Sequence, residues 1–304
     1  MKLKAKNLLT LSELSPKEFS QIIDFSIKLK KGLKKGEIKP LLKNKTLTMI
    51  FQKPSTRTRV SFEIAMFQLG GHAINLSSNE MQLSRGESIE DTARTLSRYT
   101  DCIMARVYDH KLLEQLSKFS SVPIINGLSD SFHPCQILAD FMTIKEKKKS
   151  FKGLKIAWIG DGNNVCNSMI YGCALTEMKM SIATPKGFEP KRNVINEGRK
   201  STDIEITNDP QKAIKNADVV VTDTFSSIHN RDPKRTKKFL PKFQVNSNLI
   251  KNAKKDAIFM HCLPAKRGSE VTTSVIDGSQ SVIWDEAENR LHTQKALLAL
   301  LIRA

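Results

Sequence analysis

The feature that most constrains the fold is a regular alternation of strand-like and helix-like segments along the chain of 304 residues. After an opening helix over 16–33, with Ser15 as its N-cap, short apolar runs alternate with segments of helical periodicity. The predicted strands are 46–51, 73–76, 102–107, 122–125, 155–159, 181–184, 204–207, 219–222, 258–260 and 281–284. The predicted helices between or after them are 59–69, 88–99, 112–120, 135–147, 168–177, 190–197, 210–216 and 286–302. Repeated units of this kind predict an α/β protein with parallel sheets covered by helices on both faces.

A basic segment over 145–153 interrupts the apolar periodicity and divides the alternation into two series. A chain of this length typically folds as two domains of about 150 residues each. We therefore expect two doubly wound domains, 1–148 and 149–285, with the C-terminal helix of 286–304 packing back on the first.

Ligands of doubly wound sheets bind outside the carboxyl ends of the strands, so the residues after each strand are the candidates for a site. Strand 46–51 is followed by a segment that holds Ser55, Thr56, Arg57 and Thr58 and leads into a helix. Backbone N–H groups at a helix N-terminus attract anions, and arginine matches phosphate oxygens. Helix capping needs only one of the three hydroxyls, so this segment favours a phosphate-binding site.

Further polar residues follow the next strands. Arg106 ends an apolar strand, where a charge needs either a buried carboxylate or an anionic ligand. His133 and Gln136 are three residues apart at a predicted helix start and can bind one oxygen together, although a structural histidine is as plausible here.

The second series of strands ends in a different set of side chains. A Gly-Asp-Gly segment at 160–162 lacks the third glycine of a dinucleotide-binding motif, and its Asn163 and Asn164 suit a small polar ligand. Asp223 can bind an amino group or cap a helix, and Cys262 can contact a substrate or fill a core. Arg290, in the last helix, is a surface residue by default.

The net charge of +18 suggests a polyanionic partner such as nucleic acid, or a lysine-rich surface without such a role. Aromatic residues that could stack on bases are few and do not alternate with the basic clusters, which disfavours nucleic acid. The odd number of five cysteines and the lack of a signal-peptide core predict a reduced, cytoplasmic protein. No apolar run is long enough to span a membrane.

Five segments, taken together, resemble the signature series of the ornithine carbamoyltransferases, from about Leu8 to the end of the chain. They begin with Pro54-Ser55-Thr56-Arg57-Thr58-Arg59, Met104-Ala105-Arg106 and His133-Pro134-Cys135-Gln136. The series continues with the Gly-Asp-Gly-Asn-Asn segment of 160–164 and with His261-Cys262-Leu263-Pro264-Ala265. The first motif is shared with aspartate carbamoyltransferases, and the His-Cys-Leu-Pro motif is specific to the ornithine branch.

The resemblance implies transfer of the carbamoyl group of carbamoyl phosphate to the δ-amine of L-ornithine, giving citrulline and phosphate in arginine metabolism. It implies no metal or organic cofactor, no nucleic-acid partner, and a cytoplasmic homotrimer with shared active sites. Arg106, His133 and Cys262 are its implied catalytic residues. The residues implied to bind carbamoyl phosphate are Ser55, Thr56, Arg57, Thr58, Gln82 from a neighbouring subunit, Arg106, His133, Gln136, Cys262, Leu263 and Arg290. Those implied to bind ornithine are Asn164, Asp223, Ser227 and Ile228.

One departure from the family pattern leaves two alternatives open. Ser227 is followed by Ile228 and His229, where members of the family usually have Met and Gly. A sister carbamoyltransferase acting on another amine, such as putrescine, is the alternative within the enzyme class. The net charge alone motivates the other, a nucleic-acid-binding protein. Whether the reaction serves arginine biosynthesis or breakdown does not follow from the sequence.

Overall fold

The computed structural model describes residues 3–226 and 233–302. The chain forms two compact units, unit 1 (Met1–Met142 with Asn289–Ala304) and unit 2 (Thr143–Glu288). The sequence suggested divisions after residues 148 and 285. In the structure both divisions fall inside helices, so the junction is helical rather than a loop.

Unit 1 is built on a parallel sheet of four strands in the order β2-β1-β3-β4. Its strands are β1 Thr46–Phe51, β2 His72–Ser77, β3 Cys102–Arg106 and β4 Ile124–Leu128. Its helices are α1 Pro16–Lys34, α2 Thr56–Gln68, η1 Ser78–Glu80, η2 Gln82–Arg85, α3 Ile89–Tyr99, α4 His110–Phe119 and the first part of α5 Pro134–Lys148. The second half of α12 Ile283–Ile302 also belongs to unit 1.

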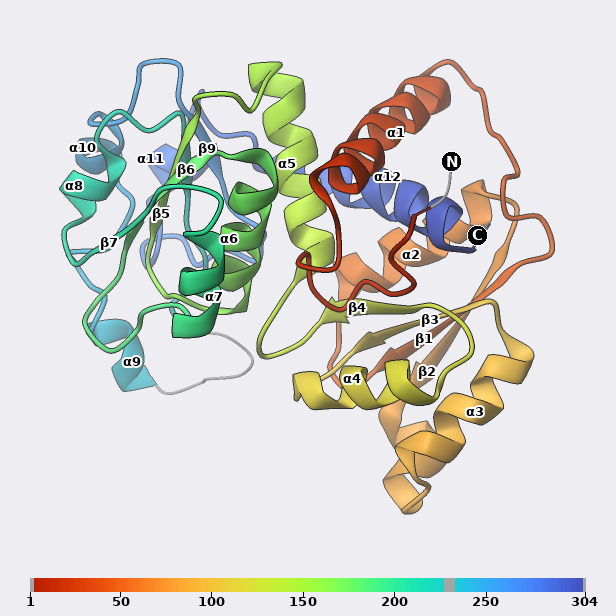
Figure 1. Cartoon of the computed structure of the whole chain (residues 1–304). Helices are drawn as coiled ribbons and strands as arrows, with labels where there is room; N and C mark the ends of the chain where they lie inside the picture. Colours follow the sequence, from red (N-terminus) through yellow and green to blue (C-terminus); the bar gives the residue numbers. More distant parts are fainter. Residues whose placement is uncertain (1–2, 227–232, 303–304) are drawn as a thin grey trace. The chain divides into compact units, whose positions relative to one another are not determined.

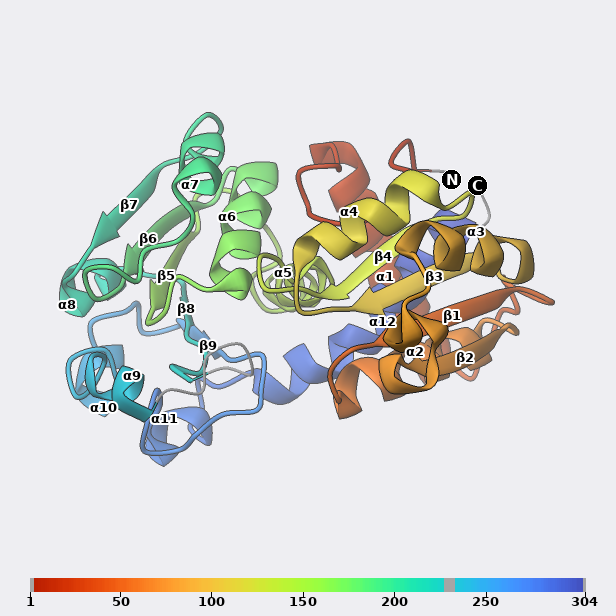
Figure 2. The ribbon, with the colours of Figure 1, turned by 90° about the horizontal axis from the view of Figure 1, so that it is seen from below.

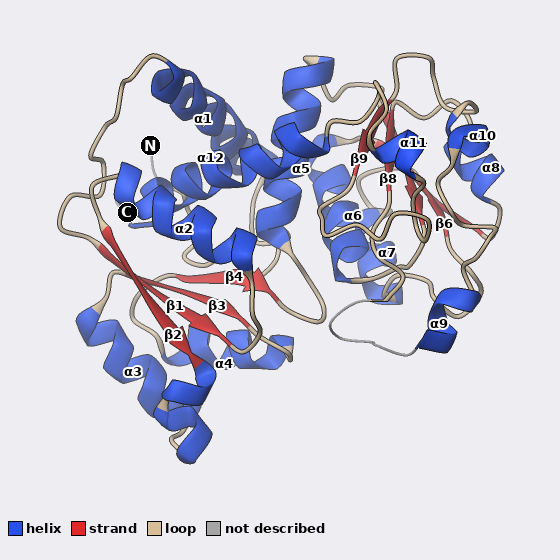
Figure 3. Cartoon of the chain, turned by 180° about the vertical axis from the view of Figure 1, so that it is seen from behind, coloured by secondary structure: helices blue, strands red, loops and turns tan. Residues whose placement is uncertain are grey.

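Helices cover both faces of this sheet. Figures 1 and 3 show α1, α2 and α12 on one face and α3 and α4 on the other. On the second face, apolar side chains of the sheet such as Ile103 and Ile124 pack against Leu113 and Leu116 of α4. Phe19 of α1 contacts Phe141 of α5 edge to face, with 5.3 Å between the ring centroids. This packing leaves the carboxyl ends of the strands as the place for a polar site.

Unit 2 is built on a parallel sheet of five strands in the order β7-β6-β5-β8-β9. Its strands are β5 Lys155–Ile159, β6 Lys179–Ala183, β7 Ile204–Thr207, β8 Val219–Val221 and β9 Ile258–Met260. Its helices are α6 Asn164–Thr176, α7 Arg192–Gly198, α8 Pro210–Ile214, α9 Pro233–Lys237, α10 Ser247–Ile250 and α11 Thr273–Ile276. Figures 1 and 2 show α6 and α7 on one face of this sheet and α8, α10 and α11 on the other.

Side-chain caps explain where several helices begin. Ser15 and Glu18 form a reciprocal capping box at α1. Ser55 accepts a hydrogen bond from the backbone N–H of Thr58 at α2, and Ser88 accepts one from Asp91 at α3. Each cap satisfies an N–H group that the first helical turn leaves without a partner.

The α/β fold class is confirmed, because both sheets are parallel and each carries helices on its two faces. Several local predictions were wrong, among them the start of α6, at Asn164 rather than residue 168, and the span of β4, Ile124–Leu128 rather than 122–125. The segment 281–284 makes only a single bridge, from Ser281 to Phe259, before α12 begins at Ile283. Helix α2 begins at Thr56 rather than at residue 59, so the hydroxyl and arginine segment forms its first turn. No helix in residues 3–226 and 233–302 is long and apolar enough to cross a membrane.

Candidate functional site

The first turn of α2 directly follows strand β1 and presents several polar groups. Ser55 is its N-cap and accepts a hydrogen bond of 3.3 Å from the N–H of Thr58. Thr56 and Arg57 are exposed, whereas Thr58 is buried. Arg59 pairs with Glu63 at 2.9 Å along the outer surface, and so points away from this turn's other groups. An exposed arginine beside free N–H groups at a helix start is suited to bind an anion.

Arg106 lies at the carboxyl end of β3, next to β1 in the sheet, and is only 8% exposed. The pairing of β3 with β4 shifts register between Ala105 and Arg106, which marks an irregularity at this strand end. Lys53, which follows β1, is also buried, and its Nζ lies 3.9 Å from the centroid of the Tyr108 ring. Burial, with the nearby charge of Arg106, lowers the pKa of Lys53 to about 8.

Arg290 is not a surface residue as its helical position suggested, because it is 4% exposed and hydrogen-bonded within unit 1. Its Nη1 donates to Oε1 of Gln136 at 2.7 Å, and its Nη2 donates to Oγ1 of Thr58 at 3.3 Å. Gln136 in turn donates from Nε2 to Asp140 at 2.8 Å. One guanidinium therefore joins the starts of α2 and α5, two helices that are far apart in the sequence.

His133 immediately precedes α5 and is 4% exposed. Burial, followed by the positive charges of Arg290, Arg106 and Arg57, lowers the pKa of His133 well below its ordinary value. The imidazole is therefore neutral at physiological pH, with one ring nitrogen as a donor and the other as an acceptor. Strands β1 and β3 are neighbours in the sheet, so Arg106, at the end of β3, lies at the same sheet edge as the start of α2.

Gln82, the residue expected to reach a neighbouring subunit, begins the short helix η2 after β2. The side chain of Gln82 is exposed. By contrast, the groups described above that lie outside the first turn of α2 are buried. Strand β2 is an edge of the four-stranded sheet. The position of Gln82 in the fold is therefore a peripheral one.

Asp223, two residues after β8, is the centre of a second polar cluster, in unit 2. Its Oδ2 accepts a hydrogen bond of 2.7 Å from Nδ2 of Asn163, and its Oδ1 accepts one of 3.3 Å from Sγ of Cys262. The backbone N–H of Thr224 also donates to Oδ1, at 2.8 Å. A carboxylate has about four lone-pair positions, so Asp223 retains capacity for a further donor.

Asn163 and Asn164 have different tasks. Asn163 caps α6 by accepting from the N–H groups of Val165 and Cys166, at 3.0 and 3.1 Å, while it holds Asp223. Asn164, the residue singled out from the sequence, is the first residue of α6 and is buried. Ser227 and Ile228 lie outside the described residues.

Cys262 and Leu263 follow β9 in a turn of unit 2. His261 fixes this turn, because its Nδ1 accepts from the N–H of Leu263 at 2.9 Å and its Nε2 faces Glu270 at 3.3 Å. Leu263 has a positive φ of 58°, an unusual conformation for a branched residue. Donor atoms of Asp223, His261 and Cys262 lie within 4.8 Å of one another, but both ring nitrogens of His261 are already engaged, so the cluster is not arranged for a metal ion.

Comparison with known families now accounts for both clusters. The carbamoyl-P binding domain of aspartate/ornithine carbamoyltransferase matches residues 6–146, and the Asp/Orn binding domain of the same family matches residues 152–301. The chain belongs to the aspartate/ornithine carbamoyltransferase family. The first turn of α2, Arg106, His133 and Gln136 lie within the first match, whereas Arg290 and the Asp223 cluster lie within the second.

Close relatives are similar over their whole length. The ornithine carbamoyltransferase of Cenarchaeum symbiosum is 60% identical over 301 residues, which cover 99% of each chain. The solved structure of ornithine carbamoyltransferase from Pyrococcus furiosus has a TM-score of 0.96 at 52% identity and covers 100% of this chain and 99% of its own. An anabolic ornithine carbamoyltransferase structure from Campylobacter jejuni has a TM-score of 0.91 at 41% identity, with 99% of each chain covered.

Within this carbamoyltransferase, some polar residues of the site had no signal in the sequence. Asn163 was considered only as a general polar residue, and its bond to Asp223 depends on the adjacency of β5 and β8. The glycines around it have a packing reason instead of a nucleotide-binding one. A Cβ on Gly162 would lie 2.3 Å from the backbone nitrogen of Pro190, so only glycine fits there.

Proposed function

We propose that the chain is an ornithine carbamoyltransferase, which transfers the carbamoyl group of carbamoyl phosphate to the δ-amine of L-ornithine and releases citrulline and phosphate. The observation that carries this function is the convergence of Arg106, His133, Gln136 and Arg290 on the start of α2 in unit 1. This set combines fixed positive charge with a neutral imidazole. It suits a small dianion that also carries a carbonyl group.

The phosphate group of carbamoyl phosphate binds at the N-terminus of α2 in this proposal. Ser55, Thr56, Arg57 and Thr58 supply hydroxyl, N–H and guanidinium donors to its oxygens. Arg57 is exposed and can meet the incoming anion, whereas Thr58 is held by Arg290 at 3.3 Å. Charge-assisted hydrogen bonds of this kind stabilise the phosphate as a leaving group.

The carbamoyl carbonyl is bound by Arg106, His133 and Gln136. The uncharged δ-amine of ornithine attacks the carbonyl carbon and a tetrahedral oxyanion forms. The C–O bond to phosphate then breaks, and the departing phosphate takes up the proton that the attacking nitrogen loses. Donors aimed at such an oxyanion typically contribute about 3–4 kcal/mol each to the stability of the transition state. A neutral His133 can donate one hydrogen bond to this oxygen without taking a proton from the amine.

Ornithine binds in unit 2 in this proposal, with its α-amino group on Asp223. The remaining acceptor capacity of Asp223 and the nearby amide of Asn164 suit the α-amino and α-carboxylate groups. Ser227 and Ile228 complete this part of the site. In the same unit, the thiol of Cys262 donates to Asp223, and the proposal assigns Cys262 and Leu263 to contacts with the substrate near the reacting carbon.

The assembly belongs to the proposal as well. Val60, Ile64 and Phe67 lie at i, i+4 and i+7 on α2 and are 51%, 39% and 76% exposed, so α2 presents an apolar stripe (defined as these three residues). The stripe supports a homotrimer in which a neighbouring subunit contributes Gln82 to the carbamoyl phosphate site. All five cysteines are free thiols, which supports a cytoplasmic location. Two relatives named as anabolic support a role in arginine biosynthesis.

The direct test is a citrulline assay with carbamoyl phosphate and a panel of amines that includes L-ornithine and putrescine. We expect citrulline from ornithine, and we expect Arg57→Ala to lower kcat/KM for carbamoyl phosphate by about 100-fold or more. The matched control is Arg59→Ala, which removes an arginine of the same turn that pairs outward with Glu63. Arg59→Ala should keep near-normal activity.

The panel also decides between the alternatives. Turnover of putrescine in preference to ornithine would replace the proposed substrate but keep the carbamoyl transfer. Arg57→Ala with unchanged kinetics would refute the assignment of the phosphate site to α2.

A further inference from the structure

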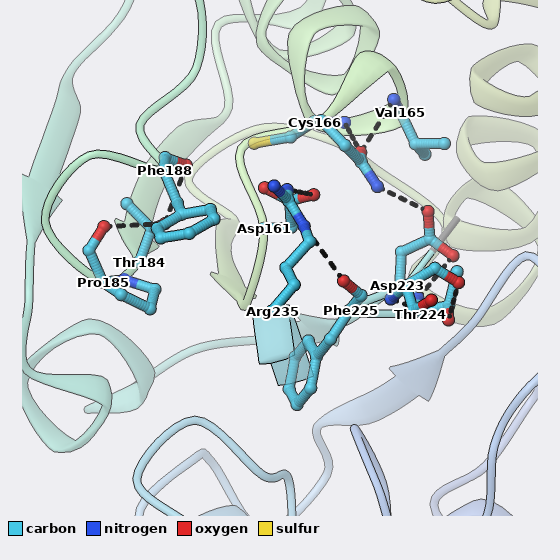
Figure 4. A network of polar contacts seen from close by, with 12 residues as sticks. Asp161, Val165, Cys166, Thr184, Pro185, Phe188, Asp223, Thr224, Phe225 and Arg235 are labelled. Carbon is cyan, nitrogen blue, oxygen red and sulfur yellow. Dashed lines mark hydrogen bonds and ion pairs between the residues drawn. The ribbon is translucent and has the colours of Figure 1, made fainter. Parts of the chain in front are cut away.

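Arg235 of α9 is a basic residue whose charged group is bound in a polar network. Its guanidinium forms an ion pair with Asp161, and its Nε donates to the backbone carbonyl of Phe225 at 3.1 Å. The side chain of Arg235 is only 17% exposed, whereas Lys237 on the same helix is exposed. Figure 4 shows the guanidinium between the Asp161 carboxylate and the Phe225 carbonyl.

Aromatic rings hold this guanidinium in place. The central carbon of the Arg235 guanidinium lies 4.6 Å from the centroid of the Phe188 ring and 5.8 Å from that of Phe239. Phe239 also stacks on Phe225, with 4.5 Å between centroids. A planar guanidinium can stack on a ring while it donates hydrogen bonds within its own plane, whereas a lysine ammonium has no planar group to stack.

The two polar partners of Arg235 follow adjacent strands of unit 2. Asp161 follows β5 and Phe225 follows β8, and these strands pair in the sheet. The same two strand ends carry Asn163 and Asp223, which are joined by their own hydrogen bond of 2.7 Å. Arg235 is therefore a second tie between the strand ends that form the Asp223 cluster.

Arg235 also determines the charge beside that cluster. Asp161 and Asp223 are both buried, at 8% and 7% exposure. Burial raises the pKa of Asp161 to about 6, while Arg235 opposes this rise and the charge of Asp223 adds to it. Removal of Arg235 would raise the pKa of Asp161 further, and the fraction of Asp161 that stays ionised would repel both Asp223 and the α-carboxylate of a bound amino acid.

We propose that Arg235 is a positioning residue for the amino-acid substrate, which ties the ends of β5 and β8 together and neutralises Asp161 so that Asp223 alone presents negative charge to the α-amino group. The inference rests on the proposed function, because it assigns Arg235 to the ornithine side of that reaction. The proposal does not assign Arg235 to the reacting atoms or to the groups that bind carbamoyl phosphate.

The test is a steady-state comparison of Arg235→Gln with the unaltered protein, in which the KM for ornithine and the KM for carbamoyl phosphate are measured separately. We expect the ornithine KM to rise about 10- to 100-fold, the range for loss of a hydrogen-bonded charge, while the carbamoyl phosphate KM changes about twofold or less. Lys237→Gln is the matched control, since it removes the same charge from an exposed position of α9. It should leave both KM values unchanged.

Two further variants separate positioning from a purely structural role. Arg235→Lys keeps the positive charge but loses the planar guanidinium with its fixed N–H donors. Compared with Arg235→Gln, it should recover only part of the ornithine affinity. The double variant Arg235→Gln/Asp161→Asn removes the uncompensated carboxylate, and its ornithine KM should be lower than that of Arg235→Gln alone. Thermal unfolding of each variant shows which of them fold.

An equal rise of both KM values in folded Arg235→Gln, or no change in the ornithine KM, would overturn the inference. A double variant no better than Arg235→Gln would overturn the neutralisation of Asp161. Failure of the proposed function gives a different result, because neither the unaltered protein nor Lys237→Gln would then form citrulline.

Discussion

At the scale of single residues, the most informative group is the buried imidazole of His133. Three arginines act on it, and together with burial they keep its pKa well below the ordinary value. A cationic imidazole would add a fourth positive charge to a confined region. In the proposed site the neutral form instead supplies a directed hydrogen bond, and the arginines supply positive charge for the anion.

This electrostatic arrangement predicts the effect of Arg290→Met. Removal of the guanidinium should raise the pKa of His133, because Arg290 is the strongest of the charges that lower it. The pKa should stay below the ordinary value of about 6.5, since burial is the larger cause. Titration of ¹³C-labelled histidine by NMR measures this shift.

Arg59→Met is the control for that titration, because Arg59 pairs with Glu63 on the exposed side of α2. Its His133 should titrate as in the unaltered protein. An unshifted His133 in folded Arg290→Met would contradict the close approach of the two side chains.

Membership of the candidate site was predictable from the sequence for residues that end or follow strands, such as Arg57, Arg106 and Asp223. Arg290 was not, because helical periodicity alone gives no sign of a buried arginine. Its burial depends on hydrogen bonds to Gln136 and Thr58, which are distant in the sequence. Resemblance to a known family assigned Arg290 to the site, and the pattern of apolar residues did not.

At the scale of elements, the first turn of α2 combines a structural and a binding task. Ser55 caps the helix, and the same turn presents the donors proposed to bind phosphate. Ser88 caps α3 in the same way, with a hydrogen bond of 3.0 Å from the N–H of Asp91, but it has no assigned ligand. The two serines therefore allow these tasks to be separated.

We expect Ser55→Ala and Ser88→Ala each to lower the free energy of unfolding by about 1 kcal/mol, the usual contribution of a serine N-cap. Only Ser55→Ala should also raise the KM for carbamoyl phosphate. Urea denaturation and steady-state kinetics measure the two effects. A Ser88→Ala variant that loses carbamoyl phosphate affinity to the same extent would show that the loss reports stability rather than binding.

The elements themselves were largely predictable, because β1, β5, β7 and β9 have the residue ranges that their apolar runs indicated. The error at 281–284 has a physical cause. A short apolar run can belong to a strand or to the start of a buried helix. Val282 and Ile283 are buried, but Ile283 begins α12, and only a single bridge joins this segment to β9. The short helices α9, α10 and α11 were missed, since four or five residues carry too little periodicity to detect.

At the scale of the whole molecule, the apolar stripe of α2 is the feature that a single chain leaves unexplained. Phe67 is 76% exposed, and a large apolar side chain in water gains free energy by association. Ile74 on the edge strand β2 is also exposed, at 42%. These residues were not recognisable from the sequence, because α2 is apolar on both its inner and outer faces.

With the stripe as the interface of the proposed homotrimer, Ile64→Glu combined with Phe67→Glu should yield monomers. Sedimentation equilibrium measures the mass, and the citrulline assay should show lost activity because Gln82 no longer reaches a neighbouring site. Tyr99→Glu is the control, since Tyr99 is equally exposed on α3. Trimers that persist in the double variant would exclude the stripe as the interface.

The return of α12 to unit 1 has a consequence for synthesis of the protein. The β-strands of unit 1 are complete by Leu128, yet Arg290, which joins Thr58 to Gln136, is supplied only near the end of the chain. Domains generally begin to fold on the ribosome as soon as their residues emerge. A nascent chain can thus form the sheet of unit 1 early, but it acquires its full set of anion-binding arginines only when translation is almost finished.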